Sequence, residues 1–175
     1  MCNDELLSTE AILVSLEGLT RDVRNPLTNL ANAAALLWET LPDINWAGFY
    51  LLDDGALWLG PFHGKPACTH IGMDKGVCGA ALSRNETLVV PDVHAFPGHI
   101  ACDESSRSEI VVPLRANGRC IGVLDIDSPT VDRFSERDRL LLEEAVRILE
   151  TRCAFARCGY NLGYNLKAEL KDDHA

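Results

Sequence analysis

The spacing of apolar residues along the chain predicts helices near both ends. Leucine and isoleucine recur at helical intervals from Glu5 to Leu19, which predicts a first helix there. The pair Asn25-Pro26 is typical of a helix start, with Asn as the cap and Pro in the first turn, and it predicts a second helix through Leu41. An amphipathic segment after Ser135 predicts a long helix from Glu136 to about Ala156.

Shorter apolar runs between these helices predict strands joined by tight turns. Asp53-Asp54-Gly55 and Asn117-Gly118 are typical of hairpin turns, and Gly76 to Arg84 is typical of a short helix. The expected strands are Ile44 to Leu52, Ala56 to Gly60, Thr87 to Val90, Glu109 to Arg115 and Arg119 to Asp127, with one more short strand between Pro61 and Gly76. Hairpin-linked strands with helices before and after them indicate an α+β domain with a central antiparallel sheet.

Composition and charge exclude several classes of partner. The 175 residues suffice for one domain, and 47% of them are hydrophobic, as in a globular protein. The formal net charge is −10, and a surface of that sign repels phosphate backbones and anionic lipids, so we expect neither nucleic acid nor a membrane as partner. No apolar run reaches the roughly 18 residues of a membrane-spanning helix, and the acidic first residues do not resemble a signal peptide.

The chain contains seven cysteines, an odd number with irregular spacing. This pattern argues against a secreted disulfide framework, so we expect a cytoplasmic protein whose thiols are mostly reduced and of which some are chemically active. Several histidines lie near the cysteines in the middle of the chain, but no Cys-x-x-Cys or His-x₃-His spacing occurs. We therefore expect no metal site.

Three cysteines in the loop-rich middle are candidates for reactivity, namely Cys68, Cys78 and Cys102. Cys78 begins a predicted helix, whose dipole favours a thiolate. Cys102 lies in the segment from Pro91 to Arg107, which has little periodicity, and loops of that length are usually functional or disordered. The acidic residues that follow Cys102 oppose its ionisation, although cationic neighbours could offset them. The residues alone do not choose among the three thiols.

Two carboxylates close the apolar strand that ends at Asp127. Asp125 and Asp127 are two residues apart, so both side chains emerge on one face of the strand, and no Lys or Arg lies between Cys120 and Ser128. One interpretation is a pair of exposed aspartates that cap a turn. The other is a buried site for an ammonium group, or a carboxylate pair that shares a proton.

The run Asn45-Trp46-Ala47-Gly48-Phe49-Tyr50 places Trp46, Gly48 and Tyr50 on one strand face. A glycine between two aromatic residues leaves a notch with ring walls on either side, in which an apolar group such as a methyl could lie. An ordinary core face explains the same pattern equally well.

Taken together, these segments resemble a known family. NWAGFYLL, LGPFHGKPAC, GVCGAAL, DVHAFPGHIACD, SEIVVPL and IGVLDIDS occur in this order, and the chain is similar over roughly Asn25 to Glu150 to the GAF-domain free methionine-(R)-sulfoxide reductases. The resemblance implies a GAF-like single domain with a central antiparallel sheet flanked by N- and C-terminal helices. Of its motifs, GHIAC together with GKPAC and DIDS is the most specific.

The resemblance also implies roles for individual residues. Cys102 corresponds to the nucleophile, Cys68 to the resolving thiol, and Cys78 to a further thiol of less settled role. The residues that correspond to the pocket for the free amino acid are Trp46, Tyr50, Glu109, Asp125 and Asp127. The expected activity is reduction of free methionine-(R)-sulfoxide to methionine by thiolate attack, followed by a sulfenic acid and an intramolecular disulfide that thioredoxin or a related dithiol reduces. No metal or organic cofactor is then needed.

Within this pocket the chemistry suggests a division of labour. Glu109 and Asp127 are assigned to the sulfoxide oxygen, because a carboxylic acid whose pKa is raised by a neighbouring carboxylate can supply a proton. Asp125 would neutralise the substrate ammonium. The ring of Trp46 would face the S-methyl group, for which the notch at Gly48 gives room.

We expect residues 1–150 to form the reductase domain, including its N-terminal helices, and residues 151–175 to be an extension of unknown role. That extension contains Cys153, Cys158 and the repeat GYNLGYNL. The resemblance further suggests a homodimer built with the N-terminal helices. Two alternatives to the reductase are a GAF-type sensor that binds an amino acid without turnover and a peroxide-type thiol sensor.

Overall fold

A six-stranded antiparallel sheet forms the centre of the molecule, with strand order β3-β2-β1-β6-β5-β4. The computed structural model describes residues 8–98 and 103–155. Its strands are β1 (Trp46–Asp53), β2 (Ala56–Gly64), β3 (His70–Gly72), β4 (Leu88–Val90), β5 (Ser108–Ala116) and β6 (Arg119–Ser128). Its helices are α1 (Thr9–Thr20), α2 (Pro26–Thr40), α3 (Gly76–Arg84) and α4 (Glu136–Arg152), with a 3₁₀ turn η1 at Val93–Ala95. The predicted α+β class with a central antiparallel sheet is confirmed.

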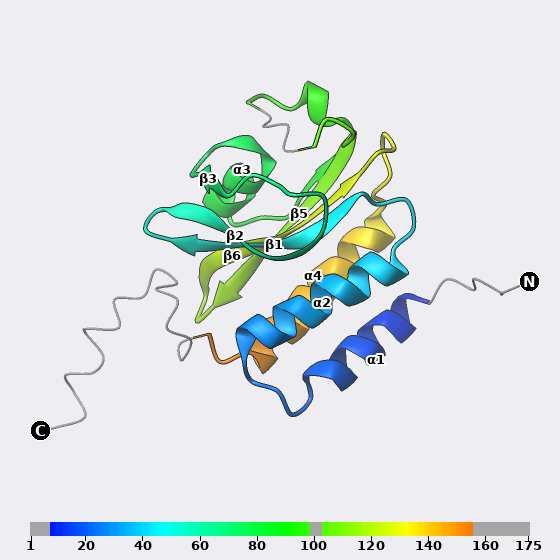
Figure 1. Cartoon of the computed structure of the whole chain (residues 1–175), viewed down its shortest axis with the longest axis vertical. Helices are drawn as coiled ribbons and strands as arrows, with labels where there is room; N and C mark the ends of the chain where they lie inside the picture. Colours follow the sequence, from blue (N-terminus) through cyan, green and yellow to red (C-terminus); the bar gives the residue numbers. More distant parts are fainter. Residues whose placement is uncertain (1–7, 99–102, 156–175) are drawn as a thin grey trace, which may run out of the picture.

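The helices lie on both faces of the sheet in unequal numbers (Figure 1). On one face, α2 and α4 pack on the strands, and α1 packs on α2 and α4. The opposite face carries α3, which contacts β5, β6 and the edge strand β3. Among the described residues, no helix is long and apolar enough to cross a membrane.

Side-chain caps fix the starts of the longer helices. The side chain of Ser8 accepts a hydrogen bond from the Ala11 amide at the start of α1, and Asn25 caps α2 with Pro26 as its first residue, as predicted. Ser135 and Asp138 form a reciprocal capping box at the start of α4. That helix ends at Arg152, earlier than the predicted Ala156, and Cys153 and Phe155 continue into the hydrophobic core.

The alternation of side chains along the strands separates a structural face from a second, more polar face. Ala47, Phe49, Ile110, Val112, Leu124 and Ile126 join the core beneath α2 and α4. The intervening residues face α3, and they include Trp46 and Tyr50 of β1, Glu109 of β5 and Asp125 of β6. Because successive residues of a strand point to opposite faces, the pleat alone places these functional candidates on one side of the sheet.

The prediction of a notch at Gly48 is wrong, because the side chains of Phe62 and Trp46 occupy that space. Gly48 pairs with Phe62 across β1 and β2, next to an irregularity in the register. A Cβ atom at Gly48 would lie 2.3 Å from the Cβ of Phe62 and 2.7 Å from the ring of Trp46. Phe62 stacks on Trp46 with ring centroids 5.3 Å apart. Glycine is therefore required for close packing between strands, and no space for a ligand remains at this position.

We expect Gly48→Ala to lower the free energy of unfolding by about 1–3 kcal/mol, since the added methyl group would overlap Phe62. Gly18→Ala is the matched control, because nothing lies within 4 Å of its new Cβ in α1 and it should be neutral or stabilising by up to about 1 kcal/mol. Denaturant unfolding of both variants measures the difference. Equal stability of the two would contradict the close packing described above.

Candidate functional site

Three carboxylates gather on the α3 face where β5 and β6 lie side by side. Glu109 pairs with Asp127 in the register of these strands, and Asp125 lies two residues along β6. Glu109 and Asp125 are each only 6% exposed, which rules out the interpretation of exposed turn-capping aspartates for Asp125. Together with the start of α3 they line a cavity of about 30 Å³, whose wall also includes Asp103 and Ser106. A cavity of that size holds one or two water molecules.

Burial controls the ionisation of this cluster. Burial raises the pKa of Glu109 well above its usual range, and the charges of Asp125 and Asp127 add to the effect. The pKa of Asp127 is also raised well above its usual range, by burial first and then by Asp125 and Asp103. Burial raises the pKa of Asp125 to about 6, while interactions with Cys78 and Glu109 limit the rise. Near neutral pH, Asp125 is therefore the carboxylate of the three that ionises most readily.

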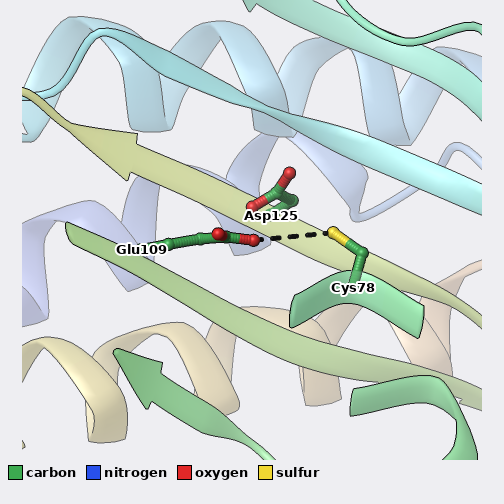
Figure 2. A group of neighbouring side chains, drawn as sticks. All are labelled: Cys78, Glu109 and Asp125. Carbon is green, nitrogen blue, oxygen red and sulfur yellow. Dashed lines mark hydrogen bonds between the residues drawn. The ribbon is translucent and has the colours of Figure 1, made fainter. Parts of the chain in front are cut away.

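Cys78 faces the carboxylates from the first turn of α3 (Figure 2). Its Sγ donates to Oε1 of Glu109 across 3.8 Å, and the side chain is buried. Burial raises the pKa of the Cys78 thiol, and Asp125 and Glu109 raise it further. The prediction that the helix dipole would favour a Cys78 thiolate is therefore wrong, because desolvation and two nearby carboxylates outweigh the dipole.

An aromatic wall stands beside the carboxylates. The rings of Trp46 and Tyr50 stack with centroids 5.8 Å apart. Trp46 Nε1 donates to the carbonyl of Lys65 at 3.2 Å, and the Tyr50 hydroxyl donates to the carbonyl of Cys68 at 3.0 Å. These two bonds hold the segment 65–68 against β1. A second cavity lies between this segment, the aromatic pair and the carboxylates Asp103, Asp125 and Asp127.

Asp103 links the segment that precedes β5 to the segment that carries Cys68. Its carboxylate accepts hydrogen bonds from the Ser105 amide at 2.9 Å and the Asn45 side chain at 3.2 Å, and it pairs with Lys65 Nζ at 3.2 Å. Hydrogen bonds from Ser105, followed by those from Lys65 and Asn45, hold the pKa of Asp103 well below its usual range. No pattern in the sequence placed this cluster in the site, although Asp-x-Ser is a usual Asx-turn signal.

The cysteines divide into two groups. Cys68 is half-buried and disulfide-bonded, whereas Cys78, Cys120 and Cys153 form no disulfide among the residues that the structure describes. Cys102, the candidate nucleophile, lies outside the described residues.

The histidines do not gather around the thiols in the part of the chain that the structure describes. His63 stacks on Trp38, His70 lies against Trp58, and His94 bonds to Asp92. The group of potential metal ligands that does form within residues 8–98 and 103–155 consists of Cys78, Glu109 and Asp125.

Comparison with known proteins identifies the family. The GAF domain model matches residues 13–152. The chain is 56% identical over 124 residues to the free methionine-R-sulfoxide reductase of Escherichia coli strain K12, which covers 71% of this chain and 75% of that protein. It is 46% identical over 154 residues to the Saccharomyces cerevisiae protein of the same name, with coverage of 83% and 86%.

The chain belongs to the GAF-domain free methionine-(R)-sulfoxide reductases. The structure of the free methionine-R-sulfoxide reductase from Neisseria meningitidis in complex with its substrate superposes with a TM-score of 0.81. That protein is 47% identical, and the match covers 87% of this chain and 92% of the other. In this member of the reductase family, the structure brings Trp46, Tyr50, Glu109, Asp125 and Asp127 together around adjoining cavities, with Cys78 beneath them and Cys68 at the aromatic wall.

Proposed function

We propose that this protein reduces free methionine-(R)-sulfoxide to methionine, with Cys102 as nucleophile, Cys68 as resolving thiol and a thioredoxin-type dithiol as reductant. The observation that carries the proposal is the buried carboxylate cluster beside an aromatic wall, reached by the segment that holds Cys68. Relatives with the name free methionine-R-sulfoxide reductase, at 46–56% identity, support the same activity.

Asp125 is suited to bind the ammonium group of a free amino acid. Its Oδ1 atom is buried and has no hydrogen-bond partner within the described chain. With a pKa of about 6, the carboxylate is largely ionised at neutral pH. An ammonium group would supply both the missing donor and the missing charge, which a buried carboxylate needs.

Glu109 and Asp127 are suited to hold the proton that the reaction consumes. Burial raises the pKa of both groups well above its usual range, which favours the protonated form of each. A protonated carboxyl can donate to the sulfoxide oxygen while the sulfur is attacked. Trp46 of the aromatic wall would face the S-methyl group.

The thiol steps balance with two cysteines and one external dithiol. The Cys102 thiolate attacks the sulfoxide sulfur, and with one proton the oxygen is transferred to give methionine and a sulfenic acid on Cys102. The Cys68 thiol then displaces water from the sulfenic acid and forms a disulfide, which the external dithiol reduces. Two features support this pairing: Cys68 is found in a disulfide, and Asp103, next to Cys102, is tied to Lys65 near Cys68.

We propose that the protein works in the cytoplasm as a homodimer. Val14 of α1 is 67% exposed and Leu140 of α4 is 55% exposed. These apolar side chains support an interface that includes the N-terminal helix.

Free methionine-(R)-sulfoxide is expected to be turned over at least 100-fold faster, in kcat/KM, than its N-acetyl form. An acyl group removes the ammonium charge and leaves the buried Asp125 carboxylate without a cation, which costs roughly 3–5 kcal/mol and so lowers kcat/KM by about two or more orders of magnitude. Oxidation of NADPH coupled through thioredoxin and thioredoxin reductase measures both rates. The same mixture without this protein is the blank. Comparable kcat/KM values for the two substrates would contradict the role of Asp125, and saturable binding of the free sulfoxide without turnover would favour the amino-acid sensor.

A further inference from the structure

Three potential metal ligands converge from three different elements at the floor of the site (Figure 2). Cys78 comes from α3, Glu109 from β5 and Asp125 from β6, and one donor atom of each lies within 4.8 Å of the others. The Cys78 Sγ to Glu109 Oε1 distance is 3.8 Å. In a tetrahedral zinc site, bonds of about 2.3 Å to sulfur and about 2.0 Å to oxygen place the two ligands about 3.5 Å apart, so only a small shift is needed.

A second observation points to a missing cation. Asp125 is only 6% exposed, and its Oδ1 has no hydrogen-bond partner among residues 8–98 and 103–155. The ion pairs of the described residues include neither Glu109 nor Asp125. The adjoining cavity of about 30 Å³ has room for an ion and a water molecule. A buried carboxylate needs positive charge once it is ionised, and residues 8–98 and 103–155 supply none to Asp125 or Glu109.

We propose that Cys78, Glu109 and Asp125 form a binding site for Zn²⁺ or a similarly soft divalent cation, with a fourth position open to the cavity. On binding, the S–H bond of Cys78 is replaced by a metal–sulfur bond, Glu109 gives up the proton that its raised pKa favours, and both protons pass to solvent. The thiolate ligand selects Zn²⁺ over Mg²⁺ and Ca²⁺, which prefer oxygen ligands alone. Because the protein supplies three ligands, a water or a small molecule can occupy the fourth position.

An ion at this site would act on the reductase activity. It would occupy the carboxylate that we assign to the substrate ammonium and the acid that we assign to the sulfoxide oxygen. Zinc would therefore inhibit turnover in competition with the free amino acid, and a chelator would reverse the inhibition. This consequence rests on the proposed function, whereas zinc binding itself does not.

The direct test is a zinc titration of the full-length protein in competition with a chromophoric chelator. The protein is purified without reductant, and mass spectrometry of the alkylated, unreduced chain verifies that the Cys68 disulfide is kept, so that this thiol does not bind zinc. We expect one Zn²⁺ per chain, and Cd²⁺ should produce the ultraviolet charge-transfer absorption of a metal–thiolate bond. Mg²⁺ at the same concentration should not displace the zinc.

Variants locate the site. Cys78→Ser and Glu109→Gln should each weaken zinc binding at least about 10-fold. Substitution of residues that only support metal ligands already lowers metal affinity about 10–100-fold. Cys120→Ser is the matched control, because this thiol lies on β6 and donates to the Gly122 carbonyl, away from the carboxylates, and it should leave zinc affinity unchanged.

Two results would overturn the proposal: no stoichiometric zinc on the wild-type protein, or equal affinity in wild type and Cys78→Ser. Neither result bears on the reductase function, which is tested separately by turnover in the presence of a chelator. Zinc binding that depends on Cys78 but leaves turnover unaffected would overturn the inhibitory role.

Discussion

Cys102→Ser is expected to form no methionine even in a single turnover, whereas Cys68→Ser should release about one equivalent and then stop. The nucleophile is needed for the first bond change, and the resolving thiol only for the second. Cys68→Ser should therefore accumulate a sulfenic acid or a mixed disulfide on Cys102. Rapid-quench measurement of methionine, with mass spectrometry of the enzyme, distinguishes the two variants.

Two other cysteines serve as references in that experiment. Cys120→Ser should behave as wild type, since this half-buried thiol bonds to the Gly122 carbonyl outside the site. Cys78→Ser should have a milder effect than either variant above, because burial keeps its thiol protonated. A full burst of methionine from Cys102→Ser would transfer the role of nucleophile to Cys78 or Cys68.

Glu109→Gln and Asp127→Asn are each expected to lower kcat by roughly 10²–10⁴-fold, the usual contribution of a general acid. Both substitutions keep the shape of the side chain and remove its acidic proton. Steady-state rates at saturating substrate measure the loss. Near-full activity in both variants would show that the proton comes from elsewhere.

The free energy of unfolding of the Glu109→Gln and Asp127→Asn variants distinguishes a catalytic role of these residues from a structural one. The folded-state pKa values of Glu109 and Asp127 are raised, so these groups lower stability as pH rises from the unfolded pKa toward the folded one. Replacing either by its neutral amide removes that cost. Denaturant unfolding at neutral pH should therefore find both variants at least as stable as wild type, while a large loss of stability would attribute the lower activity to misfolding.

Strand periodicity was sufficient to predict part of this site. The two-residue spacing of Asp125 and Asp127 placed both on one strand face, and the pattern of Trp46 and Tyr50 did the same for β1. The contribution of Glu109 depends on the register between β5 and β6, which local spacing does not determine, and it was expected only from the family resemblance. The pattern of residues within one strand thus does not show which distant segments the strand pairing brings together.

The two incorrect predictions have the same origin. Gly48 was expected to leave a notch, but Phe62 from β2 fills it. The helix start was expected to favour a thiolate at Cys78, but burial under the sheet raises the pKa of this thiol and two carboxylates from β5 and β6 raise it further. In both cases a long-range neighbour outweighs a local effect, and that neighbour is visible only once the sheet is assembled.

The most direct test of the central claim is the yield of methionine from free methionine-(R)-sulfoxide over many turnovers. Wild-type protein is incubated with the sulfoxide, thioredoxin, thioredoxin reductase and NADPH, and the amino acids are separated by chromatography. We expect methionine to form in large molar excess over enzyme, with one NADPH consumed per methionine, and the reaction to stop when thioredoxin is omitted. Sulfoxide that binds to the protein but is recovered unchanged would contradict it.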